Sequence, residues 1–144
     1  MKTIKFELVT PERVVLRTEA VSISLPTQSG EITVLPDHIP LVSVLVLGVI
    51  ELKKPDGAIE VMSVAGGFVE VLEDKVVVLS QSAHRGEELD ENEIKEAFVR
   101  AEQIKLTAKD ARETELADLH TRTAIVKEKA LAKWRKIKNI HPNK

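Results

Sequence analysis

Hydrophobic and polar positions change their period near residue 86. Before that point apolar and polar residues alternate in short runs, and after it apolar residues recur every three or four positions. Alternation is typical of strands, whereas three- and four-residue steps place side chains on one face of a helix. Gly and Pro, which break regular structure, fall mainly before residue 87. The chain is therefore predicted to contain a β domain, residues 1–86, and a helical domain, residues 87–144.

The β domain is predicted to be a sandwich of short strands. The alternation is clearest in four runs: Ile4 to Leu8, Val21 to Leu25, Ile50 to Leu52 and Ile59 to Val61. The strongest hairpin signal is Pro55-Asp56-Gly57, because Gly supplies a positive φ. A bulge or close backbone approach is indicated at Gly66-Gly67. Many short strands at close spacing favour an antiparallel sandwich or flattened barrel.

The helical domain is predicted to form a hairpin, which makes the fold class α+β. Asp90 and Asp110 have the position of N-cap residues, each with a Glu three residues later. The first helix has apolar residues at Ile94, Ala97, Phe98, Ala101 and Ile104. On the second helix we expect one apolar stripe: Leu116, Leu119, Thr123, Val126, Ala130, Trp134 and Ile137. No Gly separates the two helices, so one continuous helix is an alternative.

Charge is balanced over the chain but segregated within the helical domain. The net charge of −2 argues against a general nucleic-acid binder, because such proteins carry a basic footprint. Residues 85–121 carry a net charge of −5 and residues 122–144 a net charge of +7. Opposite charges would attract the two helices to each other, and the basic surface would equally suit an acidic partner if the hairpin opened.

Groups that could carry chemistry are few. The chain has no cysteine, and its four histidines lack the spacing of a metal-binding helix face. Asp37 and His38 stand side by side between two prolines, but neighbours in an extended segment point to opposite sides. A polar turn is therefore favoured over a catalytic pair. Since phosphate-binding loops and nucleophile elbows are also missing, we expect no catalytic residue, metal or cofactor.

The motifs, taken in order, resemble those of the epsilon subunit of the F-type ATP synthase. They are Thr10-Pro11-Glu12, Gly30-Glu31, Val34-Leu35-Pro36 with His38 and Pro40-Leu41, Gly48-Val49-Ile50, and the run from Ser63 through Gly66-Gly67 to Val71. The resemblance covers essentially the whole chain. It implies a flattened sandwich of ten strands with a helical hairpin. It also implies a non-catalytic subunit that couples ring rotation to ATP synthesis and restrains ATP hydrolysis through its C-terminal helices.

The same resemblance implies three partners: the gamma subunit, the ring of membrane c subunits and the catalytic alpha/beta hexamer. Glu31, Asp37 and His38 would lie near the ring and gamma. Six basic residues are the candidates to meet acidic segments of the hexamer when the hairpin extends: Arg122, Lys127, Lys129, Lys133, Arg135 and Lys136.

Some bacterial relatives bind ATP at the hairpin through a motif of the form [I/L]-D-x-x-R-A. Leu89 and Asp90 fit this motif, but Glu93 stands at the arginine position and Ile94 at the alanine position. An anion would therefore meet the phosphates, and we expect weak or absent ATP binding. Asp37 is a further departure, because relatives usually carry a small residue or Asn there.

The expected location is the cytoplasmic face of a bacterial plasma membrane, reached only through the complex. The N-terminal sequence MKTIKFELVTPE lacks signal- and transit-peptide features, and no run approaches the roughly 20 apolar residues of a membrane span. A plastid-encoded chain would look the same. Two alternatives stay open. One is a free-standing small-molecule-binding sandwich, for which stacking aromatic residues are scarce. The other is an enzyme using Asp37 and His38.

Overall fold

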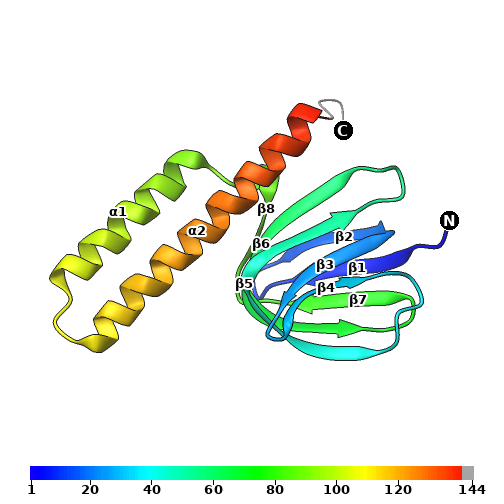
Figure 1. Ribbon diagram of the computed structural model, residues 1–144, viewed down its shortest axis with the longest axis horizontal. Helices are drawn as coiled ribbons and strands as arrows, with labels where there is room; N and C mark the ends of the chain where they lie inside the picture. The colour runs from blue at the N-terminus through cyan, green and yellow to red at the C-terminus, as the bar shows by residue number, and fades with distance from the viewer. Residues whose placement is uncertain (141–144) are drawn as a thin grey trace.

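The strands come first along the chain, the last of them ending at Arg85, and the helices follow (Figure 1). The computed structural model describes residues 1–140, so the last four residues of the helical domain, His141 among them, lie outside the described residues. The eight strands are β1 (Ile4–Val9), β2 (Val14–Ala20), β3 (Ser22–Thr27), β4 (Gly30–Val34), β5 (Leu41–Lys53), β6 (Ile59–Val71), β7 (Lys75–Leu79) and β8 (Ala83–Arg85). A single 3-10 turn, η1 (Gly86–Glu88), leads into α1 (Glu91–Thr107) and α2 (Ala111–Ile140).

The strands form one hydrogen-bonded path in the order β2-β1-β7-β6-β5-β3-β4, with β8 paired to β6. All pairs are antiparallel except β1 with β7, which run parallel. The prediction of an antiparallel sandwich is therefore confirmed apart from this pair. Because β1 and β7 lie far apart in sequence, their pairing is a non-local contact that local patterns do not specify.

The resemblance implies ten strands, and the structure has eight because β5 and β6 are each 13 residues long. Along β5 the buried side changes: Val44 is exposed and Leu45 buried, whereas farther on Ile50 and Leu52 are buried. Each long strand thus serves two parts of the sandwich. Dividing both at this change would give the implied number of ten.

The predicted close backbone approach at Gly66-Gly67 is confirmed. Gly67 has a φ of +124°, and a Cβ built on it would lie 2.0 Å from the carbonyl oxygen of Leu79. Only glycine fits this position without a shift of the neighbouring strand. The hairpin at Pro55-Asp56-Gly57 is also confirmed: Gly57 has a φ of 90°, and the Ala58 N–H donates to Asp56 Oδ1 at 2.8 Å.

The core lies inside the sandwich and is aliphatic apart from Phe6. Alternate residues of each strand point inward, as the sequence pattern predicts. The largest fully buried side chains include those of Phe6, Ile4, Leu8, Ile23, Leu25, Ile50, Leu52 and Met62. These contacts hold the sheet together and leave its outer surface free for other roles.

The two helices are separate, so the alternative of one continuous helix is wrong. The Asp90 carboxylate caps α1 by accepting from the N–H groups of Asn92 at 2.7 Å and Glu93 at 3.3 Å. The Asp110 carboxylate accepts from the N–H of Glu113 at 2.8 Å at the start of α2. Both N-caps lie where the sequence places them. Neither described helix is apolar enough over sufficient length to cross a membrane.

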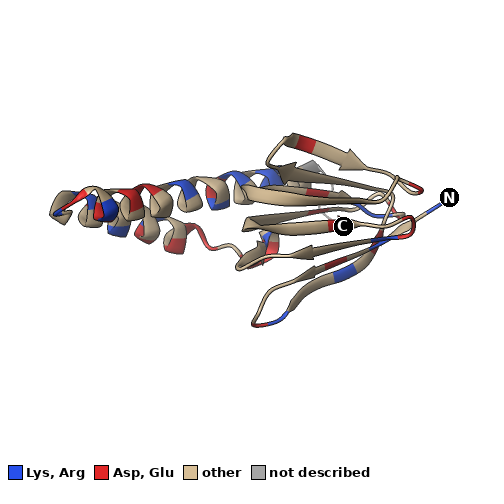
Figure 2. Ribbon diagram, turned by 90° about the horizontal axis from the view of Figure 1, so that it is seen from below, with Lys and Arg blue, Asp and Glu red and all other residues tan. Residues whose placement is uncertain are grey.

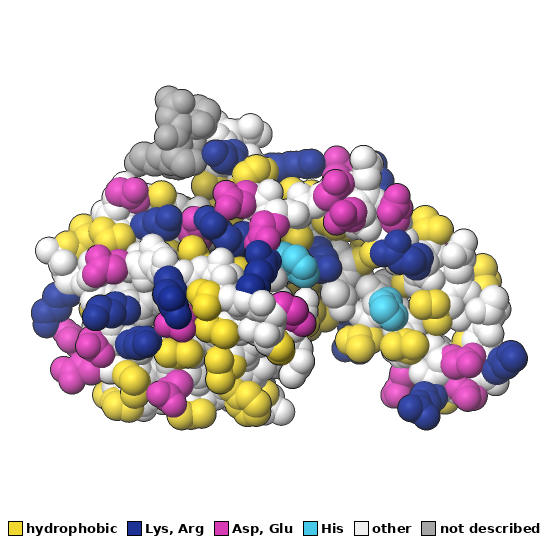
Figure 3. All heavy atoms as spheres, turned by 180° about the vertical axis from the view of Figure 1, so that it is seen from behind, with side chains coloured by type: hydrophobic (Ala, Val, Ile, Leu, Met, Phe, Trp, Pro, Cys, Tyr) yellow, Lys and Arg dark blue, Asp and Glu magenta, His cyan; other side chains and the backbone are white. Residues whose placement is uncertain are grey.

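The predicted stripe on α2 is only half correct. Its C-terminal part, with Ala130 and Trp134, faces the sandwich, but the side chains of Leu116 and Leu119 are each 48% exposed. A second face of α2, outside the predicted stripe, is also buried. It carries Ala117, Ala124 and Leu131, which are spaced seven residues apart and therefore lie on one side of the helix. Leu131 lies beside Ile94 of α1, so this second face packs in the hairpin. The stripe fails at Leu116 and Leu119 because the hairpin projects beyond the sandwich (Figures 1 and 3).

Candidate docking surfaces and the seam between the domains

An exposed apolar row crosses three adjacent strands of the sandwich. Phe68 of β6 is 58% exposed and lies directly opposite Val44 of β5 on one side and Leu79 of β7 on the other. Val42 and Val46, also exposed, lie on the same side of β5 as Val44 because strand residues two apart share a face. We call these five residues, Val42, Val44, Val46, Phe68 and Leu79, the apolar outer face. A contiguous exposed patch of this kind marks an interaction surface.

The apolar outer face is not predicted by the sequence pattern. Residues 41–50 form a nearly unbroken apolar run, which reads as a strand buried on both sides. In the structure one side of the run faces the core at Leu45, and the other side faces outward at Val44. The position of Phe68 between two apolar partners appears only once the strand register is known.

Glu31, Asp37 and His38 do not form one cluster. Glu31 is exposed beside the β3–β4 turn, whereas Asp37 and His38 follow the other end of β4. Asp37 is paired with Lys2 near the N-terminus, and this carboxylate raises the pKa of the Lys2 ammonium. His38 donates through Nδ1 to the carbonyl oxygen of Ile39 at 2.7 Å. Asp37 and His38 thus take separate partners, and their geometry is that of a polar turn.

The backbone conformation restricts which residues can stand at position 37. Asp37 has a φ of 68°, the left-handed conformation that only Gly, Asn and Asp adopt readily. Its N–H donates to the carbonyl oxygen of Glu73 at 3.2 Å, which ties this turn to the β6–β7 turn. Conformation therefore accounts for the residue type here.

Three of the six basic candidates are engaged by the folded hairpin. Lys133 pairs with Glu51 of β5 at 3.2 Å, and Arg135 pairs with Glu91 of α1 at 3.3 Å. Lys127 lies against the sandwich and is half-buried. Within residues 1–140, Arg122, Lys129 and Lys136 have no ion-pair partner. Basic residues, blue in Figure 2, recur along the C-terminal half of α2.

Charge attraction between the two helices is weaker than the sequence suggests. Among the described residues, Arg135–Glu91 is the single ion pair that joins α1 to α2, while Lys95–Glu91 and Arg100–Glu96 lie within α1. Exposed pairs of this kind contribute at most about 1 kcal/mol each. The hairpin is therefore held mainly by its small buried side chains.

The C-terminal half of α2 packs against β5, β6 and η1, and we call this contact the seam. It comprises Glu51, Leu47, Ser63, His84 and Gly86 of the sandwich side and Thr123, Val126, Lys127, Lys133 and Trp134 of α2. Within the seam the Trp134 side chain lies so close to Gly86 that a Cβ on the glycine would be 2.7 Å from it. The seam is thus a close packing contact with an exposed ion pair beside it.

Beside the seam lies a hollow of about 310 Å³ that holds the ATP-motif positions. Asp90 is already occupied as the cap of α1, and Ile94 is buried. Four carboxylates and two permanent cations line the hollow: Glu88, Asp90, Glu93 and Glu96 with Arg100 and Lys127. This balance disfavours a triphosphate, so the residues present do not fit ATP.

His84 also lines this hollow and sits half-buried under α2. Burial lowers the pKa of His84 below its ordinary value, and the nearby Lys127 ammonium acts in the same direction. Burial raises the pKa of neighbouring Glu88, but hydrogen bonds from Arg13 and from the Arg85 backbone outweigh this and lower it. The Arg13–Glu88 pair, at 2.7 Å, joins the β1–β2 turn to η1.

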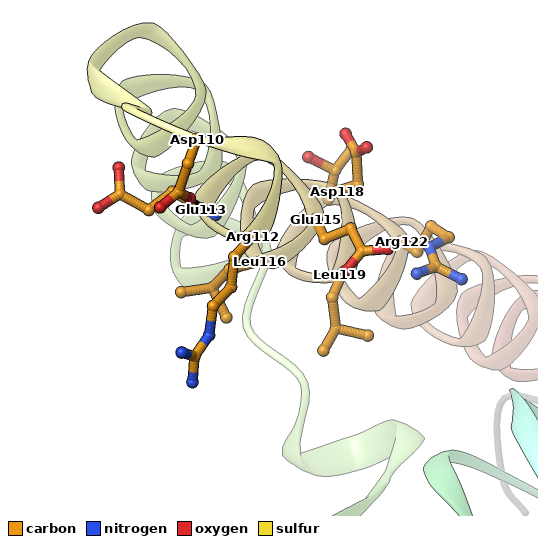
Figure 4. Close-up of a pocket in the computed structure, with 9 residues that line it drawn as sticks. Asp110, Arg112, Glu113, Glu115, Leu116, Asp118, Leu119 and Arg122 are labelled. Carbon is orange, nitrogen blue, oxygen red and sulfur yellow. Dashed lines mark hydrogen bonds between the residues drawn. The ribbon is translucent and has the colours of Figure 1, made fainter.

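A third surface lies where α2 projects beyond the sandwich. Leu116, Leu119 and Arg112 point to the same side of the helix, whereas Asp118 points to the opposite side (Figure 4). The hollow that they border is open to solvent and carries charges of both signs. Among residues 1–140 no cluster of three His, Asp or Glu side chains could hold a metal ion.

Comparison by sequence finds a family that covers more than half of the chain. Residues 3–86 match the family described as "ATP synthase, Delta/Epsilon chain, beta-sandwich domain". The ATP synthase epsilon chain of Anoxybacillus flavithermus is 46% identical over 102 residues, which cover 71% of this chain and 75% of the relative. The epsilon chain of Bacillus subtilis is 41% identical over 103 residues, which cover 72% and 77%.

Comparison by structure extends the likeness to the hairpin. A chain of the Euglena gracilis mitochondrial ATP synthase superposes with a TM-score of 0.78 at 22% identity, covering 91% of this chain and 82% of that chain. A chain of the Tetrahymena thermophila mitochondrial ATP synthase, from its central stalk and c-ring, gives 0.56 at 17% identity and covers 91% and 99%. Because 91% coverage reaches past residue 86, the shared fold includes helices as well as the sandwich.

Proposed function

The chain belongs to the delta/epsilon family of ATP synthase chains, and from this premise we propose that it works in the central stalk of the enzyme. It is a non-catalytic subunit. Its role would be to couple rotation of the membrane ring to ATP synthesis and to restrain ATP hydrolysis through its C-terminal helices. Its place would be the cytoplasmic face of a bacterial plasma membrane, which it would reach through the complex.

The observation that carries this proposal is the apolar outer face. Its five residues add nothing to the core of the sandwich, because they point away from it. Their exposure costs free energy in water, and burial against a partner would recover about 25 cal/mol for each Å² covered. A stalk subunit requires a stable interface of this kind with a neighbouring subunit. We assign the apolar outer face to the gamma subunit.

The polar turns would supply further contacts. Asp37 and His38 at one end of β4, and Glu31 at the other, are accessible to the ring of c subunits and to gamma. The unpaired cations Arg122, Lys129 and Lys136 would meet acidic segments of the catalytic hexamer. Lys127, Lys133 and Arg135 would do so only after the hairpin leaves the sandwich, since the folded hairpin engages them.

The test is binding of the purified chain to the gamma subunit. Replacing Phe68 with Ser removes the central side chain of the apolar outer face, and we expect at least a tenfold weaker affinity because central aromatic residues dominate interfaces. Leu106→Ser is the matched control: Leu106 is 79% exposed on α1 and lies outside this face. Gamma binding unchanged by Phe68→Ser would contradict the assignment of the face.

Membership of the stalk is tested separately by purification from native membranes. Recovery of the chain together with gamma and the catalytic hexamer is the expected result, and recovery without them would overturn the proposal. The alternative of a free-standing small-molecule binder has weaker support. A hollow of about 1100 Å³ runs along α2, outside the sandwich, and is open and charged.

A further inference from the structure

A histidine lies inside the seam. His84 of β8 lines the two hollows that flank this contact, and Lys127 of α2 lines both of them as well. The smaller hollow also brings in Ser63 of β6, which pairs directly with His84 in the strand register, and Val126 of α2. His84 is therefore covered by α2 only while the hairpin is docked.

We propose that the seam is acid-labile: a proton on His84 weakens the packing of α2 on the sandwich and favours release of the hairpin. Histidine suits such a role because its charge changes in the physiological pH range. The seam suits it because its ion pair, Lys133–Glu51, is exposed and so contributes at most about 1 kcal/mol. A positive charge under α2 would therefore act mainly against the packing contacts of the seam.

The charged groups around His84 come from four elements. Lys127 of α2 and Arg13 of the β1–β2 turn oppose a positive charge on the ring, whereas Glu88 of η1 and Glu93 of α1 favour it. Glu88 is already paired with Arg13 at 2.7 Å, which limits its help. Asp90, Glu96 and Arg100 line the same hollow, and Asp90 is held by backbone N–H groups. Burial has the largest effect on the pKa of His84, and together with Lys127 it opposes protonation of the ring.

The direction of the pH dependence follows from the two states. In the docked state burial and Lys127 hold the pKa of His84 below its ordinary value. Release of α2 removes both causes, so the pKa rises toward about 6.5. The released state therefore binds the proton more tightly. Docking has its full strength above pH about 6.5 and weakens as the pH falls toward the lower pKa of the docked state.

The consequence for the enzyme depends on the proposed function. If the extended hairpin restrains ATP hydrolysis, acidification of the surrounding compartment would shift this subunit toward the restraining form. The docking equilibrium itself belongs to the isolated chain. An experiment on the isolated chain can therefore contradict the acid-labile seam and leave the stalk assignment intact. Equally, the stalk assignment can be wrong while the seam is acid-labile.

The experiment follows the seam in the full-length chain between pH 8 and 5. Trp134 is the only tryptophan, so a single indole N–H signal in a 15N-labelled sample reports its packing on Gly86. Amide hydrogen exchange of residues 126–134, corrected for the intrinsic effect of pH, reports docking independently. We expect exchange from the released state to increase below pH about 6.5, by up to about tenfold per pH unit for one proton.

Two histidine variants separate the proposal from a general effect of acid. His84→Gln should abolish the increase in exchange, and His120→Gln, at an exposed site on α2, should behave as the original chain. An increase that persists in His84→Gln, or none in the original chain, would overturn the proposal. Should His84→Gln fail to fold, Lys127→Gln tests the same idea, because it should raise the pKa of His84 measured from its ring signals and reduce the pH effect. An unchanged pKa and pH effect in Lys127→Gln would count against the proposal.

Discussion

Gly67 is the position with the strictest requirement for a particular residue. Its φ of +124° excludes side chains on conformational grounds, and the Leu79 carbonyl oxygen fills the place of a Cβ. The close approach of β6 to β7 depends on this glycine. It brings Phe68 and Leu79 into direct opposition at the centre of the apolar outer face.

Gly67→Ala should therefore destabilise the chain more than Gly30→Ala. Gly30 has a similar φ of +113°, but a Cβ there would meet nothing within 4 Å. Backbone strain alone should cost about 1–3 kcal/mol in Gly30→Ala. The clash should add about 1–3 kcal/mol in Gly67→Ala. Urea unfolding measures both free energies. Equal losses would mean that strand β7 yields freely to the added methyl group.

Among the elements, the strands and helices were predictable because each depends on local patterns. Asp90 and Asp110 identify two helix starts, and alternation identifies the inward side of β1 and β3. The failures are non-local. Leu116 and Leu119 continue the stripe of α2, but the sandwich ends before it reaches them, and no feature of the helix sequence records where a neighbouring domain stops.

The two faces of α2 give contrasting expectations for leucine. Leu131 is 5% exposed and packs in the hairpin, so Leu131→Ala should destabilise the helical domain by about 2–3 kcal/mol. Leu119→Ala should change stability by no more than about 0.5 kcal/mol, because Leu119 is 48% exposed and lies beyond the sandwich. Thermal unfolding followed by helical circular dichroism compares them. Comparable losses would show that the projecting part of α2 is packed in solution.

At the scale of the whole molecule, the change from strands to helices was visible in the sequence, but the contacts between them were not. The change near Gly86 is a local signal, since residues 87–141 contain neither Gly nor Pro. The seam, the β1–β7 parallel pair and the apolar outer face each join segments distant in the chain. The candidate residues Glu31 and His38 are close in sequence, yet β4 separates them in space.

The hollow beside the seam is built from both domains, and it sets our expectation for nucleotides. Calorimetric titration of ATP into the chain should detect no binding in the micromolar range, because the lining carboxylates outnumber the cations. The double variant Glu93→Arg with Ile94→Ala supplies the motif of the ATP-binding relatives and should gain measurable affinity. Micromolar binding by the original chain would contradict this expectation.

The length of β5 and β6 has a mechanical consequence. The same two strands carry Phe68 and Val44 at one end and Glu51, the anchor of Lys133, toward the other. In a rotating assembly they would act as a two-stranded beam. A load applied by the partner seated on the apolar outer face would travel along covalent backbone to the seat of α2, without crossing a loop. Torque applied at the apolar outer face and release of α2 at the seam would then be coupled through the same pair of strands.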